Sequence, residues 1–327
     1  MKDIILSIII PVYNASAYLR ETMQSIVENI NERVEVICID DGSTDNSLKI
    51  LNEYAKKYNI MILNQPHLGA PAARNYGTIN AQGDYIFYFD ADDVLERGSI
   101  EFIISELKRN DNDLLIFNYE IINERGIKVG ERNHKNHIFA KGKNSLLLYF
   151  YLIPPFPGNK IYRKSIITNK DITFADVRIG QDLNFYLKYL PFSKNKKIFN
   201  FCISKYRLLP KSISHSYDDR VLDIVKSLEN VYDYYKKNNL EKYLNFLYFS
   251  EIGTLTFQCS KLYKYSDEIL KKSIFYEFDG LIKERLKIIK KKSLYEKFKF
   301  FQLYTNYKKT KEDLLWGFPI LILGIYF

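Results

Sequence analysis

The chain has 327 residues, of which 46% are hydrophobic and 27% are charged, and its formal net charge is +9. This hydrophobic content is enough for a sizeable core and indicates a globular protein with one large domain or two smaller ones. Three widely spaced cysteines (Cys38, Cys202 and Cys259) form no C-x-x-C pair, so neither a disulfide framework nor a thiolate metal site is indicated and a reducing cytoplasm is favoured.

The first hundred residues alternate between strand-like and helix-like segments. Residues 5–12 form a short apolar run that is typical of a strand buried on both faces. The alternation predicts a parallel α/β sheet with helices on both faces, and ligands of such sheets bind beyond the carboxyl ends of the strands. The further predicted elements are helices at 17–29, 47–58 and 71–81 and strands at 34–39, 60–63 and 85–89.

The rest of the chain is less regular at first and then becomes helical. We expect a helix at 99–109, a strand at 114–118, and an irregular polar stretch at 123–143 in which His134 and His137 lie in a solvated loop. Beyond residue 216, Lys, Tyr and Leu recur at helical spacing with few glycines or prolines. The predicted organisation is an α/β domain at 1–217, with halves at about 1–100 and 101–217, followed by a helical, basic region at 218–327.

Three carboxylates, Asp90, Asp92 and Asp93, come directly after the predicted strand at 85–89. Crowded carboxylates suit a hard cation such as Mg²⁺ or Mn²⁺, which proteins hold with one or two carboxylates and the phosphates of a substrate. The other interpretation is that these residues solvate a turn or cap a helix that begins near Glu96. The first interpretation predicts a metal that grips a diphosphate.

Five short motifs extend this pattern along the chain. They are Pro11-Val-Tyr-Asn14, Ile39-Asp-Asp-Gly-Ser-Thr-Asp45, Gly69 with Ala73-Arg-Asn75, Gly83-Asp-Tyr-Ile86 and Phe89-Asp-Ala-Asp-Asp93. Together they resemble the N-terminal half of the family 2 glycosyltransferases, strongly over residues 5–100 and fairly through about residue 215. The resemblance implies a GT-A fold with a Rossmann-like, mostly parallel sheet and flanking helices. It also implies a nucleotide-sugar donor, a divalent metal and transfer with inversion at the anomeric carbon.

The resemblance assigns Asp41 to the nucleobase of the donor. An ionised carboxylate only accepts hydrogen bonds, so it favours uracil or guanine, which carry a ring N–H, over cytosine. A UDP-sugar is therefore preferred to a GDP- or dTDP-sugar; the alternative role of Asp41 is an Asx-turn before Gly42. The other residues that the resemblance places at the donor are Pro11, Val12, Tyr13, Asn14, Gly42, Arg74, Asn75, Asp90 and Ala91.

The resemblance also implies which residues hold the metal. Asp92 would ligate an Mn²⁺ or Mg²⁺ ion that bridges the two phosphates, and Asp90 would contact ribose or a metal-bound water. The metal stabilises negative charge on the leaving nucleotide. Asp93 is expected to support the site or cap a helix rather than to ligate. His215 is a weaker candidate for a third ligand.

Inverting transfer needs a base on the acceptor side. In the motif Gly180-Gln181-Asp182-Leu183, Asp182 matches the aspartate that serves as base in the family. Gln181 replaces a common glutamate, which leaves its contribution to the orientation and pKa of Asp182 open. Asp182 also suits the N-cap of a helix at 183–190, and the two roles are compatible. The segment from Asn159 to Tyr162 resembles the acceptor side of the family.

Positive charge is concentrated outside the first hundred residues, which carry 8 basic and 14 acidic side chains. The remainder therefore suits an anionic partner. The segment from Lys283 to Lys299 reads as a basic, aromatic amphipathic helix. Such a helix predicts attachment to the cytoplasmic face of a membrane, or packing on the catalytic domain or on a second copy of the chain. The apolar stretch at 314–327 is too short to span a bilayer. The basic residues concerned are Lys283, Arg285, Lys287, Lys290, Lys291, Lys292, Lys297 and Lys299.

These patterns predict an inverting, metal-dependent glycosyltransferase that acts in cell-surface polysaccharide synthesis. It would move a hexose or N-acetylhexosamine from a UDP-sugar to a glycan or lipid-linked saccharide. The alternatives are a sugar nucleotidyltransferase, whose Gly-rich N-terminal loop is missing, and a catalytically silent glycosyltransferase-like binding module. A dinucleotide-dependent oxidoreductase is disfavoured because no G-x-G-x-x-G occurs. No nucleic-acid-binding motif is recognised, so no nucleic-acid partner is expected.

Overall fold

The computed structural model describes residues 4–134, 146, 149–209, 218–262 and 267–289. The chain forms two compact units. The first comprises residues 1–139, 155–176 and 181–210, and the second comprises residues 140–154, 177–180 and 211–327. This division gives residues 140–154, 177–180 and 211–217 to the second unit, whereas the predicted α/β domain included all residues from 1 to 217.

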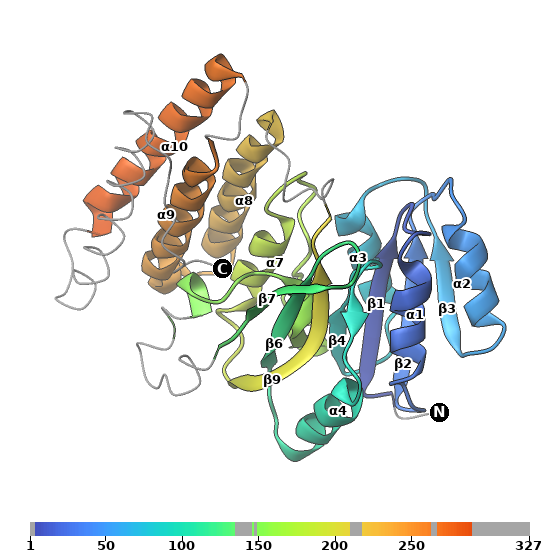
Figure 1. The fold of residues 1–327 in the computed structure, drawn as a ribbon. Coiled ribbons are helices and arrows are strands. Elements are labelled where there is room, and N and C mark those ends of the chain that lie inside the picture. Colours follow the sequence, from blue (N-terminus) through green and yellow to red (C-terminus); the bar gives the residue numbers. More distant parts are fainter. Residues whose placement is uncertain (1–3, 135–145, 147–148, 210–217, 263–266, 290–327) are drawn as a thin grey trace. The chain divides into compact units, whose positions relative to one another are not determined.

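The first unit is built on one mixed sheet (Figure 1). In the described part of the chain its strands follow the order β3-β2-β1-β4-β8-β6-β9-β5, with β7 beside β6. β1 is parallel to β2 and β4, and β2 is parallel to β3, so the predicted parallel arrangement of residues 5–89 is confirmed. These strands are β1 (Leu6–Val12), β2 (Val34–Asp40), β3 (Ile60–Asn64) and β4 (Tyr85–Tyr88).

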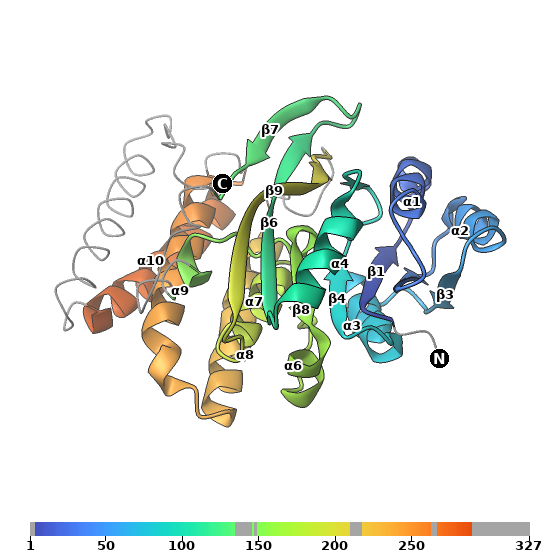
Figure 2. The ribbon, with the colours of Figure 1, turned by 90° about the horizontal axis from the view of Figure 1, so that it is seen from below.

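Antiparallel pairs extend the sheet beyond β4. β8 is antiparallel to both β4 and β6, β9 is parallel to β6, and β5 is antiparallel to β9. Figure 2 shows β6 and β9 lying side by side, with β7 continuing beyond them. The strands are β5 (Val94–Leu95), β6 (Leu114–Ile122), β7 (Lys128–Arg132), β8 (Lys160–Arg163) and β9 (Lys196–Arg207).

The stretch at 123–143 differs from its prediction. It contains β7, which returns along β6 after a turn in which Gly126 has a φ of 77°. His134 is buried, with 1% of its surface exposed, and its N–H donates to Asn118 Oδ1 at 2.8 Å. The solvated-loop prediction is therefore wrong for His134, while His137 lies outside the described residues.

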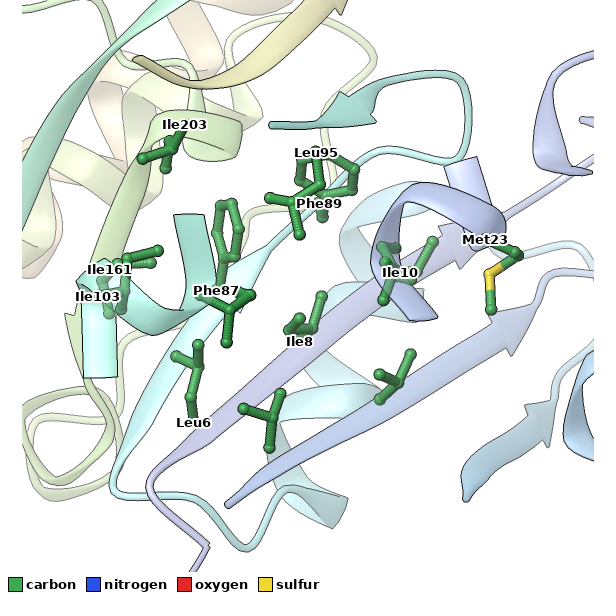
Figure 3. Packing of buried hydrophobic residues seen from close by; sticks show 14 of the residues in the cluster. Leu6, Ile8, Ile10, Met23, Phe87, Phe89, Leu95, Ile103, Ile161 and Ile203 are labelled. Carbon is green, nitrogen blue, oxygen red and sulfur yellow. The ribbon is translucent and has the colours of Figure 1, made fainter. Parts of the chain in front are cut away.

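One face of the sheet is covered by α1, α2 and α4. Alternate residues of β1, Leu6, Ile8 and Ile10, are fully buried against this layer, as the period of a strand dictates. Figure 3 shows them with Met23 of α1 and with Phe87 and Phe89 at the end of β4. The helices are α1 (Leu19–Val27), α2 (Ser47–Ala55) and α4 (Ser99–Arg109).

The opposite face carries α3 (Ala70–Asn80) and α7 (Gln181–Tyr189). Gly77 lets α3 approach the sheet closely, because a Cβ atom there would lie 2.5 Å from Ile9 Cγ2 and 2.8 Å from Ile39 Cδ1. Next to α3, rings from β4, β8, α7 and the loop before α7 form an aromatic cluster, in which Phe174 of the loop and Phe185 of α7 stack at 4.1 Å. The other members of this cluster are Tyr88, Tyr162 and Tyr189. A short helix, α6 (Lys164–Asn169), follows β8.

The second unit contains the helices α8 (Asp223–Lys237), α9 (Leu244–Ser260) and α10 (Glu268–Ile289). A buried ion pair joins two of them, with Arg285 Nε donating to Glu251 Oε2 at 2.8 Å. Tyr232 of α8 donates to the same carboxylate. None of the helices in the described ranges is long and apolar enough to cross a membrane.

The structure describes part of the predicted basic amphipathic segment. In α10 the apolar side chains of Phe278, Ile282 and Leu286 are buried, and Lys283 and Arg285 form ion pairs with Asp279 and Glu251. Within residues 268–289 the apolar face is therefore used inside the second unit. The membrane hypothesis now depends on residues 290–299, which lie outside the described residues.

Candidate active site

Three of the predicted motifs meet at one edge of the sheet. β1, β2 and β4 are parallel neighbours, and Val12 pairs with Asp40. The N–H of Asp41 donates to the Val12 carbonyl at 2.8 Å, and the N–H of Phe89 donates to the Ile9 carbonyl at 2.9 Å. The segments 11–14, 40–45 and 89–93 therefore lie at the carboxyl ends of adjacent strands, where parallel sheets bind ligands.

Asp41 is a buried acceptor at this edge, with 2% of its surface exposed. Its carboxylate accepts hydrogen bonds from the N–H groups of Leu68 at 2.8 Å and Gly69 at 2.9 Å. It also accepts one from Gln65 Nε2 at 2.7 Å and lies 3.0 Å from His67 Nδ1. A carboxylate offers about four acceptor positions. The loop at 65–69 fills them, so a ligand N–H reaches Asp41 by replacing one of these donors.

The local turn after β2 is formed by the neighbouring carboxylate. Asp40 Oδ2 accepts from the N–H of Ser43 at 3.3 Å, whereas the bonds of Asp41 reach residues 65–69. Gly42 has a φ of 74°, and a Cβ atom there would lie 3.2 Å from the N atom of His67. Gly42 thus gives the loop at 65–69 room beside Asp41.

A stacked ring pair lies next to Asp41. The rings of Tyr13 and His67 have centroids 3.9 Å apart and planes inclined by 20°. Tyr13 keeps 46% of its surface exposed. Sequence reasoning did not single out His67 or Gln65; their position directly before Gly69 of the third motif was the available signal.

Two predicted donor-site asparagines fix loops instead of pointing into open space. Asn14 has a φ of 47°, which asparagine tolerates better than most residues. Its Oδ1 accepts from the N–H of Thr44 at 2.8 Å. Asn75 exchanges two hydrogen bonds with the backbone of Phe174, at 2.9 and 3.0 Å. Pro11 is half-buried and Val12 is buried in β1.

Arg74 connects two predicted site residues that are far apart in sequence. It lies in α3 and is buried, with 4% of its surface exposed. Its Nη2 lies 2.7 Å from Asp90 Oδ1 and its Nη1 lies 3.2 Å from Asp182 Oδ1. Its guanidinium lies 5.2 Å from the centre of the Phe174 ring. Arg74 is therefore a buried, paired cation and not a surface charge.

The carboxylates after β4 have different surroundings. Asp93 is fully buried, and its Oδ1 accepts from the N–H of Arg207 at 2.9 Å. Arg207 Nε in turn donates to the carbonyl of Asp92 at 2.8 Å, and Thr22 Oγ1 donates to the carbonyl of Ala91 at 2.9 Å. Burial, followed by repulsion from Asp90 and Asp92, holds the pKa of Asp93 well above its usual range. Asp93 thus anchors the turn to β9.

The Asp92 carboxylate has no such anchor. In the described part of the chain it accepts a hydrogen bond from its own N–H group alone. Burial, and then the negative charge of Asp90, raise its pKa to about 6. A divalent cation would relieve this repulsion, and two carboxylate donors completed by phosphate oxygens are a set that Mg²⁺ and Mn²⁺ accept. Asp90 and Asp92 therefore fit such an ion.

A larger protein-only ligand set is not seen among the described residues, where no three His, Cys, Asp or Glu side chains gather around a common position suited to a metal. His215, the weaker candidate for a third ligand, lies outside the described residues.

Asp182 lies in the first turn of α7 with 33% of its side chain exposed. Its carboxylate is bound to Arg74 and open to solvent on one side. Burial raises the pKa of Asp182, the charge of Arg74 lowers it, and the charge of Asp90 raises it again. A carboxylate in this position can accept a proton from a hydroxyl group that approaches its exposed side.

Lys160 is a buried cation beside α7 that sequence reasoning placed on the acceptor side without a role. It is fully buried in β8, and its Nζ donates to the Phe156 carbonyl at 2.6 Å and to Asn159 Oδ1 at 2.8 Å. Burial holds its pKa well below the usual range, while the charge of Asp182 opposes this shift. The charge of Lys160 also lowers the pKa of Asp182.

Comparison with known proteins gives the chain a family. Residues 7–169 match the family model described as Glycosyl transferase family 2. The chain is 32% identical over 193 residues to poly(ribitol-phosphate) beta-glucosyltransferase of Bacillus spizizenii, a match that covers 56% of this chain and 30% of that protein. It is 35% identical over 117 residues to glycosyltransferase GlyG of Streptococcus pneumoniae, a match that covers 35% of this chain and 39% of GlyG. The chain thus spans well under half of either relative.

The fold is similar to that of S. aureus TarS 1-349 in its crystal structure in complex with UDP-GlcNAc. The TM-score is 0.67 at 17% sequence identity, and the match covers 96% of this chain and 92% of the TarS chain. The likeness shows a GT-A fold with a helical C-terminal region, as the sequence motifs predicted.

Proposed function

The chain belongs to glycosyltransferase family 2 through residues 7–169, and on that basis we propose that it transfers a sugar, with inversion, from a nucleotide-sugar to a hydroxyl group of a saccharide. One observation carries the proposal. The donor-side carboxylate Asp90 and the acceptor-side carboxylate Asp182 lie within hydrogen-bond reach of one guanidinium, that of Arg74. This proximity supports a single site in which Asp90 serves the donor and Asp182 serves the acceptor.

The donor in this proposal is a UDP-sugar. The acceptor-only carboxylate of Asp41 suits the ring N–H of uracil, and the exposed ring of Tyr13 offers a stacking surface. The similar TarS structure contains UDP-GlcNAc, which supports this choice. Asp90 and Asp92 would hold Mn²⁺ or Mg²⁺, which supplies positive charge for the diphosphate of the leaving nucleotide.

Asp182 acts as the base in this proposal. It must be ionised to take a proton from the acceptor hydroxyl, and the positive charge of Arg74 favours the ionised form. Arg74 also fixes one carboxylate oxygen, so the other oxygen is available for the incoming hydroxyl. A positioned base typically contributes about 10²–10⁴-fold to the rate.

The acceptor is proposed to be an anionic glycan or lipid-linked saccharide of the cell surface. The name of the Bacillus spizizenii relative specifies poly(ribitol-phosphate), and the excess of basic residues after residue 100 suits an acceptor that carries phosphate groups. Attachment to the inner face of the membrane would bring the chain close to such acceptors.

The test incubates the full chain with Mn²⁺, poly(ribitol-phosphate) and one sugar donor at a time, a UDP-, GDP- or dTDP-sugar. It measures release of the matching nucleoside diphosphate, which is UDP, GDP or dTDP. We expect Asp182→Asn to lose transfer by about 100-fold or more while it still binds UDP, and Asp92→Ala to lose Mn²⁺-dependent UDP binding. The control is Asp111→Asn, whose side chain is 85% exposed. Near-normal turnover by Asp182→Asn would contradict the assignment of the base.

The same assay separates the alternatives. A sugar nucleotidyltransferase would form a UDP-sugar from UTP and a sugar 1-phosphate, and a silent binding module would bind UDP without releasing it from any UDP-sugar.

A further inference from the structure

Arg74 has an environment that differs from that of a ligand-binding arginine. Its guanidinium is buried, and its two terminal nitrogens are already bound to Asp90 and Asp182. Its Nε is also buried and has no hydrogen-bond partner in the described part of the chain. An arginine that grips a diphosphate needs terminal N–H groups free to point at phosphate oxygens. On each terminal nitrogen of Arg74, one N–H is directed at a protein carboxylate.

The surrounding residues hold this guanidinium in one position. The Phe174 ring lies against it, and Phe174 is stacked on Phe185 of α7. The backbone of Phe174 is in turn bound by Asn75, the residue after Arg74. The amide of Asn75, which was predicted to lie at the donor, thus holds the backbone of Phe174. Helix α3 fixes both the guanidinium and the ring beneath it.

We propose that Arg74 is a positioning residue that holds the base Asp182 and the donor-side carboxylate Asp90 in one hydrogen-bonded unit; this rests on the proposed function. A guanidinium is planar and always charged, so each of its two ends fixes the direction of one carboxylate. Without it, two carboxylates would face one another across a site lined by aromatic rings. Asp182 would then turn away or take up a proton, and neither form can receive a proton from the acceptor.

The first test compares Arg74→Lys with the wild-type chain. Lysine keeps the charge, but its single ammonium group cannot direct two separate nitrogens at Asp90 and Asp182 as a guanidinium does. We expect kcat to fall about 100-fold, the cost of a misplaced catalytic group, while the Kd for UDP with Mn²⁺ changes by less than about threefold, a difference of under 1 kcal/mol. Arg163→Lys is the control, because Arg163 of β8 pairs with Asp113 at 3.0 Å.

Two outcomes of this test would overturn the proposal. Unchanged kcat in Arg74→Lys would show that the base needs no guanidinium. A Kd for UDP weakened about tenfold or more, the loss of about 1.4 kcal/mol, with kcat retained at saturating donor, would show that Arg74 grips the donor instead. A melting curve like that of the wild type shows that the variant is folded.

A second test does not require turnover, so it distinguishes failure of this inference from failure of the proposed function. Carboxyl ¹³C NMR follows the titration of Asp182 in the metal-free chain. We expect Arg74→Gln to raise the pKa of Asp182 by about one unit or more. We expect Asp90→Asn to lower it, because the whole guanidinium charge then serves Asp182. Arg163→Gln should leave it unchanged. An unchanged pKa in both site variants would overturn the proposal even in a chain that transfers no sugar.

Discussion

At the residue scale, neighbouring acidic residues have distinct structural roles. Asp93 is buried and bound by the backbone of β9. The carboxylate of Asp92 forms no ion pair among the described residues, although the charge of Arg207 lowers its pKa. The sequence located these residues correctly at a strand end and favoured Asp92 over Asp93 as a ligand, a prediction that stays open. It could not reveal the partners of Arg74, because Asp182 lies 108 positions away and its location depends on the folding of everything between them.

The raised pKa of Asp92 predicts that its ionised carboxylate lowers the free energy of unfolding at neutral pH. Its folded-state pKa of about 6 exceeds the ordinary value of 3.8. The carboxyl group therefore contributes stability below about pH 4 that is lost as the pH rises through 6. In EDTA at about pH 7.5, Asp92→Asn should raise the free energy of unfolding by on the order of 1–3 kcal/mol. The gain should vanish near pH 4, where aspartic acid is also neutral.

Urea unfolding at the two pH values measures this effect. The exposed Asp84 provides a control, because Asp84→Asn should change stability little at either pH. A loss of stability in Asp92→Asn that is equal at both pH values would mean that the side chain has a structural partner.

At the element scale, the parallel strands and their helices were predictable, and so was β6, which begins at the predicted strand at 114–118. The other strands added beyond β4 were not. Residues 5–12 and 34–39 are apolar runs whose burial follows from composition alone. β8 has four residues, too few for a periodic signal. β9 alternates poorly, with a burial pattern that changes along its length. Both segments are strands because they pair with strands that are distant in sequence. A local sequence pattern carries no information about such partners.

The close approach of α3 to the sheet gives a prediction at this scale. Gly77→Ala would place a methyl group 2.5 Å from Ile9 Cγ2, so either the isoleucine side chains or α3, which carries Arg74, must shift. We expect a loss of about 1–3 kcal/mol of stability from overpacking and a lower transfer rate. Gly280→Ala in α10 is the matched control, because its Cβ meets nothing within 4 Å. It should gain about 0.5–1 kcal/mol from helix propensity. Thermal melts of both variants that shift alike would contradict this reasoning.

At the scale of the whole molecule, positive charge is concentrated after the first hundred residues. The sequence predicted the GT-A fold and the helical C-terminal region, and both are found. It did not predict that short segments at 140–154 and 177–180 join the second unit, because membership of a unit depends on contacts formed after folding. The basic segment after residue 289 is where composition still points to an anionic partner.

Membrane attachment is testable in the full chain. Replacing Lys290, Lys291 and Lys292 with Gln should reduce flotation with vesicles that contain anionic lipids, since each basic residue near such a surface contributes about 1 kcal/mol. Replacing Lys56 and Lys57, which are exposed in the first unit, is the control. Equal flotation of the two variants would disprove attachment through this segment.

The ring of His67 stacks on Tyr13 with one nitrogen 3.0 Å from Asp41, which is the position that we propose for the nucleobase of the donor. If the donor binds there, its base must displace the imidazole of His67 from Tyr13. The affinity of the donor then depends on the difference in free energy between the base stacked on Tyr13 and His67 stacked on Tyr13. A planar inhibitor would have to displace the same imidazole. Molecules that bind to the exposed side of Tyr13 and leave the imidazole in place would avoid that exchange, which makes them a separate starting point for ligand design.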